Sequence, residues 1–321
     1  MHFTKAVIAL VMFVAAGTAA HADWPNDRPI RILVGAGPGG GTDIITRFLA
    51  DRLSKVLKQS VFVENKQGAG GTLAATEVSR AAPDGYTAIM FSAGNTVSAA
   101  MFKSTPFDLV KSFAPVAMVT NSEFVFVARN DLPANDIKGL IALAKSEPGK
   151  LNFASVGLGS TQHLAGEVLA QDAGIKVTHI PYRTTPALVA ALMAGQIDYA
   201  VELVQAVGGQ VAAGKLKLLA VASPQRWPAL PDVPTVAESG APGYSVVGWY
   251  GLAYPAGTPR PIVDKMYGAL KQILDEPAIR EQIAKIGAVV HVLDPDQFHD
   301  HIKLEIAKWS AARDKASLKA Q

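Results

Sequence analysis

Residues 35–43 read Gly35-Ala36-Gly37-Pro38-Gly39-Gly40-Gly41-Thr42-Asp43, a glycine-rich stretch between an apolar run at 30–34 and a helical pattern at 44–57. Five glycines in nine residues let the backbone approach a ligand closely, because no Cβ blocks it. The first N–H groups of a helix have no partner inside that helix. A strand, a glycine loop and a helix start therefore predict a binding site for an anion.

The composition of the chain is that of a globular protein. Its 321 residues are 49% hydrophobic and 18% charged, which is enough for two lobes with separate cores. It contains no cysteine, so disulfides and thiolate metal sites are excluded. The formal net charge of +3 is too small to indicate nucleic-acid binding, and we predict none.

The first 22 residues have the pattern of a secretory signal peptide. Lys5 precedes a short apolar run at 6–16, and Ala20-His21-Ala22 has the small-x-small form of a cleavage site. We predict cleavage after Ala22 and release into the periplasm. The alternative, a membrane anchor, would need about 18 or more consecutive apolar residues, and this run is shorter.

Short β-rich runs alternate with helical patterns along most of the chain. Strands are predicted at 30–34, 61–64 and 86–91, with helices at 44–57 and 73–81 between them. This alternation is typical of an α/β fold with a parallel sheet. It begins again after two apolar runs that flank residues 121–123, which we interpret as a crossover into a second lobe, and a second glycine loop follows at 157–161.

The alternation predicts two doubly wound sheets joined by a hinge. We assign a signal peptide to 1–22, the first part of lobe 1 to 23–122 and lobe 2 to 123–234. Four prolines within 224–234 suit an irregular return connection. Residues 235–321 are then expected to return to lobe 1 with C-terminal helices that pack on it.

A dinucleotide site is one alternative for the first glycine loop. Residues 35–40 match the spacing G-x-G-x-x-G, and Glu64 ends the second strand close to where a ribose-binding acid belongs. However, Pro38 removes an N–H from the loop, and an exported protein meets little NAD. The phosphate loop of nucleotide hydrolases requires Lys where this chain has Gly41.

Catalytic and metal-binding patterns are weak. Ser160, Thr161 and His163 lie near the second glycine loop, but the serines there do not stand in a G-x-S-x-G elbow. His299 and His301 suggest a metal pair, yet side chains two residues apart on a helix point in different directions. We therefore predict no catalytic residue, no metal and no cofactor, and expect the hydroxyls and loop amides to bind a solute.

Six motifs together resemble one known family. In chain order they are PGGGTD at 38–43, VENKQGAGG at 63–71, PDGYT at 83–87, G-x-G-S-x-x-H-L at 157–164, LPDVPT at 230–235 and PAGTP at 255–259. They resemble the periplasmic solute-binding receptors of tripartite tricarboxylate transporters, often called Bug-type receptors. The resemblance extends over nearly the whole mature chain.

The resemblance implies a two-lobed periplasmic-binding-protein fold of the Venus-flytrap type. The solute would be a small carboxylate, such as a di- or tricarboxylate, an aromatic acid or an amino acid, delivered to membrane permease subunits without catalysis. We expect a monomer. Carried over by position, the expected solute contacts in lobe 1 are Pro38, Gly39, Gly40, Gly41, Thr42, Asp43, Ser92 and Asn95. Those in lobe 2 are Ser155, Gly157, Gly159, Ser160, Thr161, His163, Tyr182, Arg183 and Glu202.

Three departures from the family pattern concern the solute. Gln67 stands where proline is common, and Thr184 stands where glycine is common. Glu202 begins a stretch that typically reads Asp-Asn-x-Pro. A Glu202 carboxylate that faced the cleft would repel a second anionic group on the solute, or bind an amine.

Two alternative functions stay open on sequence alone. An exported dinucleotide-binding or hydrolytic enzyme could use the loop at 35–43. A solute sensor that reports to a signalling partner could use the same pocket as a transport receptor.

Overall fold

The computed structural model describes residues 24–102 and 104–315. The predicted signal peptide and its cleavage site lie outside these residues. Within them, none of the helices is long and apolar enough to cross a membrane.

The first glycine loop lies in a parallel arrangement of strands and helices, as predicted. The elements are β1 (Ile30–Val34), α2 (Gly41–Leu57), β2 (Val61–Asn65), η2 (Ala69–Gly71), α3 (Thr72–Ser79), β3 (Thr87–Ser92) and α4 (Ala93–Met101). Strand β1 lies between β2 and β3 and is parallel to both. Helix α4 was not expected, because its small residues after the strand suggested a loop.

A second α/β unit repeats this pattern. Its elements are α5 (Ile137–Ser146), β5 (Asn152–Ser155), α6 (Thr161–Ala173), β6 (Thr178–Pro181), α7 (Thr185–Met193), β7 (Tyr199–Leu203), α8 (Val204–Ala212) and β8 (Leu216–Val221). Strand β5 is parallel to β6 and β7. The proline-rich segment that follows contains no helix or strand, as predicted.

Two long strands connect the units. The crossover predicted at residues 121–123 lies inside a single strand, because β4 (Phe113–Arg129) continues through it for 17 residues. Its first half pairs with β9 (Val247–Pro255) and β10 (Ala288–Leu293), and its second half pairs with β7 and β8. Polar residues at 121–123 keep strand geometry because their backbone groups are paired with β9.

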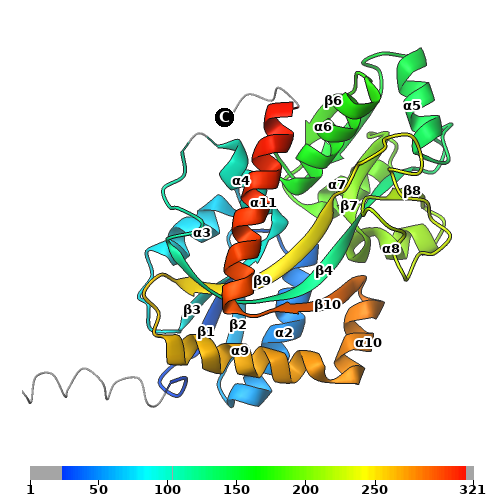
Figure 1. The fold of residues 1–321 in the computed structure, drawn as a ribbon. Coiled ribbons are helices and arrows are strands. Elements are labelled where there is room, and N and C mark those ends of the chain that lie inside the picture. Colours follow the sequence, from blue (N-terminus) through cyan, green and yellow to red (C-terminus); the bar gives the residue numbers. More distant parts are fainter. Residues whose placement is uncertain (1–23, 103, 316–321) are drawn as a thin grey trace, which may run out of the picture.

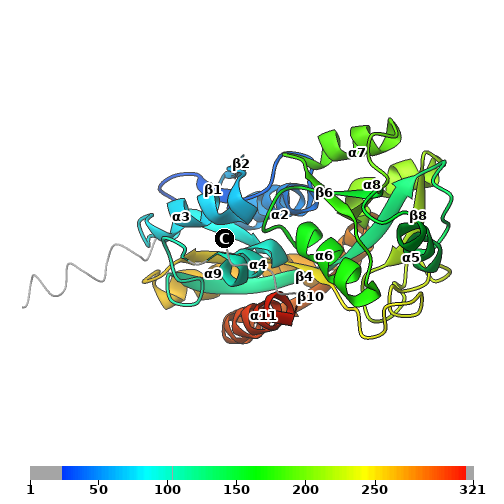
Figure 2. The same cartoon turned by 90° about the horizontal axis from the view of Figure 1, so that it is seen from above.

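The strand order is β2-β1-β3-β9-β4-β7-β5-β6, so one curved sheet passes through the whole molecule. We call the β1, β2, β3, β9, β10 part of this sheet, with its helices, lobe 1, and the β5, β6, β7, β8 part lobe 2. Figures 1 and 2 show β4 and β9 running side by side between the two lobes. The fold is therefore two-lobed and α/β, whereas the residue boundaries of the domains stay a prediction.

The C-terminal helices pack on lobe 1. The C-terminal segment contains α9 (Arg260–Asp275), α10 (Pro277–Lys285), the unexpected β10 and α11 (Pro295–Lys315). Helix α11 packs against α4 and β4, and α9 packs against α2 and β4 (Figure 1). The first and last thirds of the chain therefore build one lobe together.

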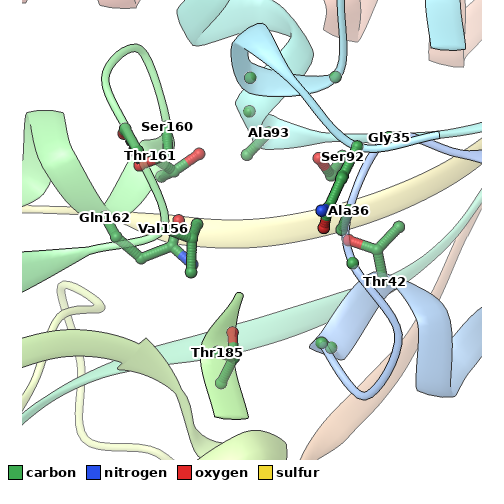
Figure 3. A pocket seen from close by; sticks show the side chains of 18 of the residues that line it. Gly35, Ala36, Thr42, Ser92, Ala93, Val156, Ser160, Thr161, Gln162 and Thr185 are labelled. Carbon is green, nitrogen blue, oxygen red and sulfur yellow. Dashed lines mark hydrogen bonds between the residues drawn. The ribbon is translucent and has the colours of Figure 1, made fainter. Parts of the chain in front are cut away.

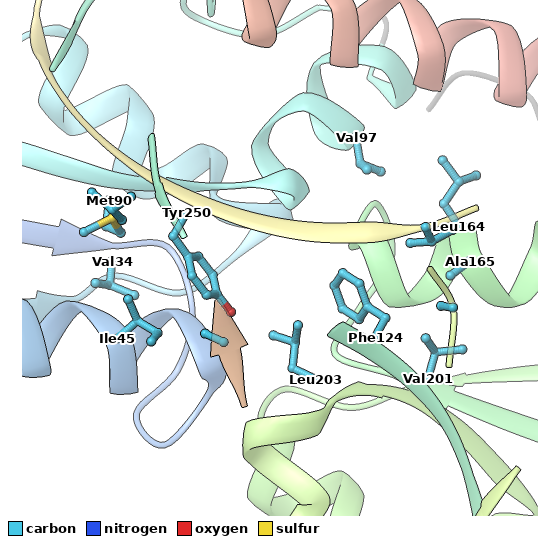
Figure 4. Packing of buried hydrophobic residues seen from close by; sticks show 14 of the residues in the cluster. Val34, Ile45, Met90, Val97, Phe124, Leu164, Ala165, Val201, Leu203 and Tyr250 are labelled. Atoms are coloured by element: carbon cyan, nitrogen blue, oxygen red, sulfur yellow. The ribbon is translucent and has the colours of Figure 1, made fainter. Parts of the chain in front are cut away.

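The main hydrophobic core continues from one lobe into the other. Val34, Ile45 and Tyr250 pack in lobe 1, and Phe124 and Leu203 continue the cluster into lobe 2 (Figure 4). All five are buried. Burying a side chain of this size stabilises the fold by roughly 1.5–3 kcal/mol.

A buried carboxyl group lies where β4 passes from one lobe to the other. Glu123 is the last β4 residue paired with β9, and Phe124 is the first paired with β7. Glu123 Oε1 accepts hydrogen bonds from the N–H groups of Ala222 (2.8 Å) and Ser223 (2.9 Å). Its Oε2 has no partner among the described residues. Burial raises the pKa of Glu123 to about 7, against the opposing effect of hydrogen bonds from Ser223 and Ala222.

The raised pKa of Glu123 predicts a pH-dependent stability. Because the folded-state pKa lies above the unfolded value, the folded state binds the proton more tightly, and stability is lost as pH rises through about 7. Lowering the pH from about 8 to about 5 should increase the free energy of unfolding by about 3 kcal/mol more in the wild type than in Glu123→Gln. Urea unfolding of both proteins at several pH values measures this difference. Parallel pH profiles would contradict it.

Candidate functional site

A cavity of about 700 Å³ lies between the two lobes. It is lined from lobe 1 by the first glycine loop, the 67–71 loop and the end of β3, and from lobe 2 by the loops after β5 and β6. Figure 3 shows Thr42, Ser92 and Ala36 on one side of the cavity and Gln162, Val156 and Thr185 on the other. The cavity has the volume typical of small-molecule sites.

Four helices begin at the cavity wall. The lining includes Gly41 and Thr42 of α2, Ala93 and Gly94 of α4, Thr161 and Gln162 of α6, and Thr185 of α7. Helix α2 has no side-chain cap, because the residue before it is Gly40. The positive ends of four helix dipoles, two from each lobe, therefore point toward one volume, which favours an anion there.

Charged side chains are scarce around the cavity. In the described part of the chain, Arg183 is the one charged residue in the lining, and it is exposed. Within the same residues, no group of three or more His, Asp or Glu side chains is placed to hold a metal ion. The favourable potential for an anion thus comes mainly from backbone dipoles and neutral donors.

The first glycine loop is held in place by Asp43. Its Oδ2 accepts a hydrogen bond from Gly39 N–H at 3.0 Å, and its Oδ1 accepts from Arg47 Nε at 2.9 Å and Asn65 Nδ2 at 2.8 Å. Burial alone would raise the pKa of Asp43, but these hydrogen bonds outweigh it and lower the pKa below its ordinary value. Asp43 is therefore an ionised support of the loop and lies outside the cavity lining.

The second glycine loop is held by Ser160. Its hydroxyl donates to Gly157 O at 2.7 Å and accepts from His163 N–H at 3.1 Å, which caps α6. This hydroxyl is therefore committed to the loop, although the residue lines the cavity. Thr42 is also buried, and its hydroxyl hydrogen-bonds with Tyr250.

Two histidines lie behind the second loop. His163 and His179 stack with ring centroids 4.3 Å apart, and His179 Nε2 lies 2.7 Å from Ser155 Oγ. Burial lowers the pKa of both rings, and the neighbouring His163 further lowers that of His179, to about 4. Both imidazoles are therefore neutral at physiological pH, and neither lines the cavity.

The structure brings ten of the seventeen expected contacts into the lining. These are Gly40, Gly41, Thr42, Ser92, Asn95, Gly157, Ser160, Thr161, Tyr182 and Arg183. Their contact with a solute stays a prediction. The other seven lie outside the lining: Pro38, Gly39, Asp43, Ser155, Gly159, His163 and Glu202. Glu202 is 0% exposed, so its carboxylate does not face the cleft.

Sequence reasoning missed several lining residues. Gln162 is the second residue of α6, after the cap Ser160, and Thr185 is the first residue of α7, after the cap Thr184, so the rule that helix starts bind anions could have found them. The apolar wall includes Phe102, Phe124 and Trp249. Nothing in the sequence distinguishes these aromatic residues from core residues.

The lobes touch each other on both sides of the cavity. Ser98 Oγ in α4 lies 3.2 Å from the carbonyl oxygen of Gly70 in lobe 1 and 3.2 Å from that of Gly159 in lobe 2. A Cβ on Gly41 would lie 2.6 Å from Leu203 Cδ1. The two lobes are therefore in contact at glycine residues, where the lack of a side chain lets them approach closely.

Known proteins are similar to this chain in sequence and in fold. A family model described as tripartite tricarboxylate transporter family receptor matches residues 45–318. The R. palustris protein Rpa4515 with adipate has a TM-score of 0.89 and 30% identity, covering 92% of this chain and 99% of that one. The periplasmic binding protein BugD has a TM-score of 0.87 and 34% identity, with coverage of 92% and 99%. MatC from Rhodopseudomonas palustris with bound malate has a TM-score of 0.84 and 33% identity, with coverage of 89% and 99%. The expected periplasmic-binding-protein fold is confirmed.

A matched pair of glycine substitutions tests the contact between the lobes at Gly70 and Gly159. Gly70 and Gly174 both have φ of 62°, so alanine costs each a similar backbone strain of about 1 kcal/mol. A Cβ at Gly70 would lie 2.0 Å from Ser98 Oγ in lobe 1 and 2.8 Å from the carbonyl oxygen of Gly159 in lobe 2, whereas one at Gly174 meets nothing within 4 Å. We expect Gly70→Ala to lose more stability than Gly174→Ala, because Ser98 must move, and Gly70→Ala alone to bind a carboxylate solute about tenfold more weakly, by calorimetry. Equal affinities would show that this contact does not govern closure.

Proposed function

This chain belongs to the tripartite tricarboxylate transporter receptor family, and from that premise we propose that it is an exported, monomeric periplasmic receptor. It captures a small organic carboxylate between its lobes and delivers it to membrane permease subunits. It performs no chemistry on the solute and needs no cofactor. The adipate and malate of the related structures support the carboxylate class.

This proposal rests on one observation: four helices begin at the wall of the same cavity. The solute carboxylate accepts hydrogen bonds from unpaired backbone N–H groups, foremost those at the uncapped start of α2. Each charge-assisted hydrogen bond contributes about 1.5–3 kcal/mol, so several of them hold an anion without a paired lysine or arginine.

Closure of the lobes distinguishes the receptor with bound solute from the receptor without it. The solute contacts both lobes only when they are closed, so it shifts the equilibrium toward the closed form by its differential affinity. Strands β4 and β9 connect the lobes and are where the bending occurs. The closed form then presents a surface that the permease subunits distinguish from the open one.

The enzyme alternatives use the same loop in a different way. A dinucleotide would need the 35–40 loop to hold a pyrophosphate and Glu64 to reach a ribose, but Glu64 Oε2 is paired with Arg31 at 3.1 Å and lies outside the cavity lining. A sensor function would use the cavity as a transport receptor does. Pull-down of permease subunits by the liganded protein supports transport, and pull-down of a signalling protein supports the sensor.

Thermal unfolding with a panel of compounds tests the solute class. The panel contains mono-, di- and tricarboxylates, aromatic acids, amino acids and NAD. A carboxylate at 100 times its dissociation constant should add about 2.7 kcal/mol of stability. A rise in Tm with NAD alone would contradict the receptor function.

Two hydroxyl substitutions separate binding from structure. The Thr161 hydroxyl lines the cavity and has no hydrogen-bond partner in 24–102 and 104–315. Thr161→Val should therefore weaken carboxylate binding about tenfold with little change in Tm, because only a solute contact is lost. Ser160→Ala should instead lower stability by about 1 kcal/mol, because it removes the cap of α6. Calorimetry and urea unfolding of both variants give the two quantities. An unchanged affinity in Thr161→Val would remove this hydroxyl from the site.

A further inference from the structure

Glu202 lies directly behind one part of the cavity wall. Its Oε1 accepts a hydrogen bond from Thr185 Oγ1 at 3.0 Å, and its Oε2 accepts from Leu203 N–H at 3.1 Å. The side chain of Gln162 also hydrogen-bonds to it. Thr185 and Gln162 both line the cavity, while Glu202 itself is fully buried. Figure 3 shows Thr185 and Gln162 across the cavity from Thr42.

When Glu202 is ionised, it fixes which atoms its neighbours present to a solute. A carboxylate can only accept hydrogen bonds, so the single hydroxyl hydrogen of Thr185 is used and an oxygen lone pair remains for the cavity. The same argument places the NH₂ group of Gln162 toward Glu202, which leaves its carbonyl oxygen as the free end. Two neighbouring acceptors therefore face the solute.

The charge of Glu202 also alters the electrostatics of this wall. Thr185 is the first residue of α7, and Leu203 is the residue before α8, so the Glu202 carboxylate compensates the positive ends of two helices. No lysine or arginine in the described residues pairs with it. The starts of α4 and α6 contain no acidic residue, and the carboxylate of Asp43 in the first turn of α2 is used by the loop and by Arg47 and Asn65, so these three helix starts remain available to a solute carboxylate.

We propose that Thr185 and Gln162, positioned by Glu202, form a subsite that selects a hydrogen-bond donor at the end of the solute remote from its carboxylate. The inference rests on the proposed function and narrows it. The solute carries a hydroxyl, amide or ammonium group at that end, because a second carboxylate would meet two acceptors and a buried negative charge. Glu202 is a positioning residue, since it acts through Thr185 and Gln162.

Matched linear carboxylates measure this selectivity. At each chain length the remote end is a hydroxyl, an ammonium, a methyl or a second carboxylate, and affinities are measured by calorimetry. The pH is about 8, where Glu202 is ionised, since burial raises its pKa to about 7. We expect the wild type to bind the best donor-terminated acid about tenfold or more tightly than the dicarboxylate of the same length.

The variants isolate the role of each group. In Glu202→Gln the charge is gone and the amide can donate to Thr185, so the donor preference should fall about tenfold. Thr185→Val should lose the preference in the same way, and Thr185→Ser should keep it because the hydroxyl remains. Glu123→Gln is the matched control: the same substitution at a buried glutamate outside the cavity lining, where the preference should be unchanged.

The outcomes distinguish this inference from the proposed function. Equal or tighter binding of the dicarboxylate by the wild type would overturn the subsite, as would an unchanged preference in Thr185→Val. Neither result depends on whether Glu202→Gln folds, because one is measured on the wild type and the other on Thr185→Val. Failure of every carboxylate to bind would instead overturn the receptor function, and the subsite with it.

Discussion

The direction of the chain in a parallel sheet determines where this protein can bind an anion. The carboxyl ends of parallel strands and the starts of the following helices meet at the same edge of a sheet. Here two such edges face each other, and β4 and β9 hold them in that orientation. Helices from both lobes therefore begin at one cavity, and a site for a negative charge arises from backbone geometry before any side chain is considered.

The side chains around this cavity mostly support the backbone. Asp43 holds the first glycine loop, and Ser160 caps the helix that follows the second. Both residues looked like solute contacts because they stand next to glycine loops. Their polar atoms are used within the protein: Asp43 accepts from Gly39 N–H and from two side chains, and Ser160 donates to Gly157 O and accepts from His163 N–H. We propose that selectivity depends on the few side chains whose polar atoms remain available, such as Thr161 and the pair Thr185 and Gln162 in front of Glu202.

The sequence predicted the parts of the fold that depend on local patterns. The strand, glycine loop and helix around Gly35 to Asp43 could be identified because glycine spacing and apolar periodicity are local signals. The continuity of β4 could not, since residues 121–123 are polar and become a strand only through pairing with β9, more than a hundred residues away. The burial of Glu202 was missed for a related reason. A carboxylate is rarely buried without a lysine or arginine, and its hydrogen-bond donors come from separate helices.

The sharing of lobe 1 between the two ends of the chain also constrains how the protein is made. Helix α11 covers α4 and β4, and β9 fills the sheet position between β3 and β4. A nascent chain that has produced β1 to α4 therefore lacks the central strand and the covering helix of its own first lobe. Lobe 2 is built from one uninterrupted segment, and its contacts are nearer in sequence. When the chain emerges from its N-terminal end, the second lobe can assemble first, and the first lobe stays incomplete until the last helix is available.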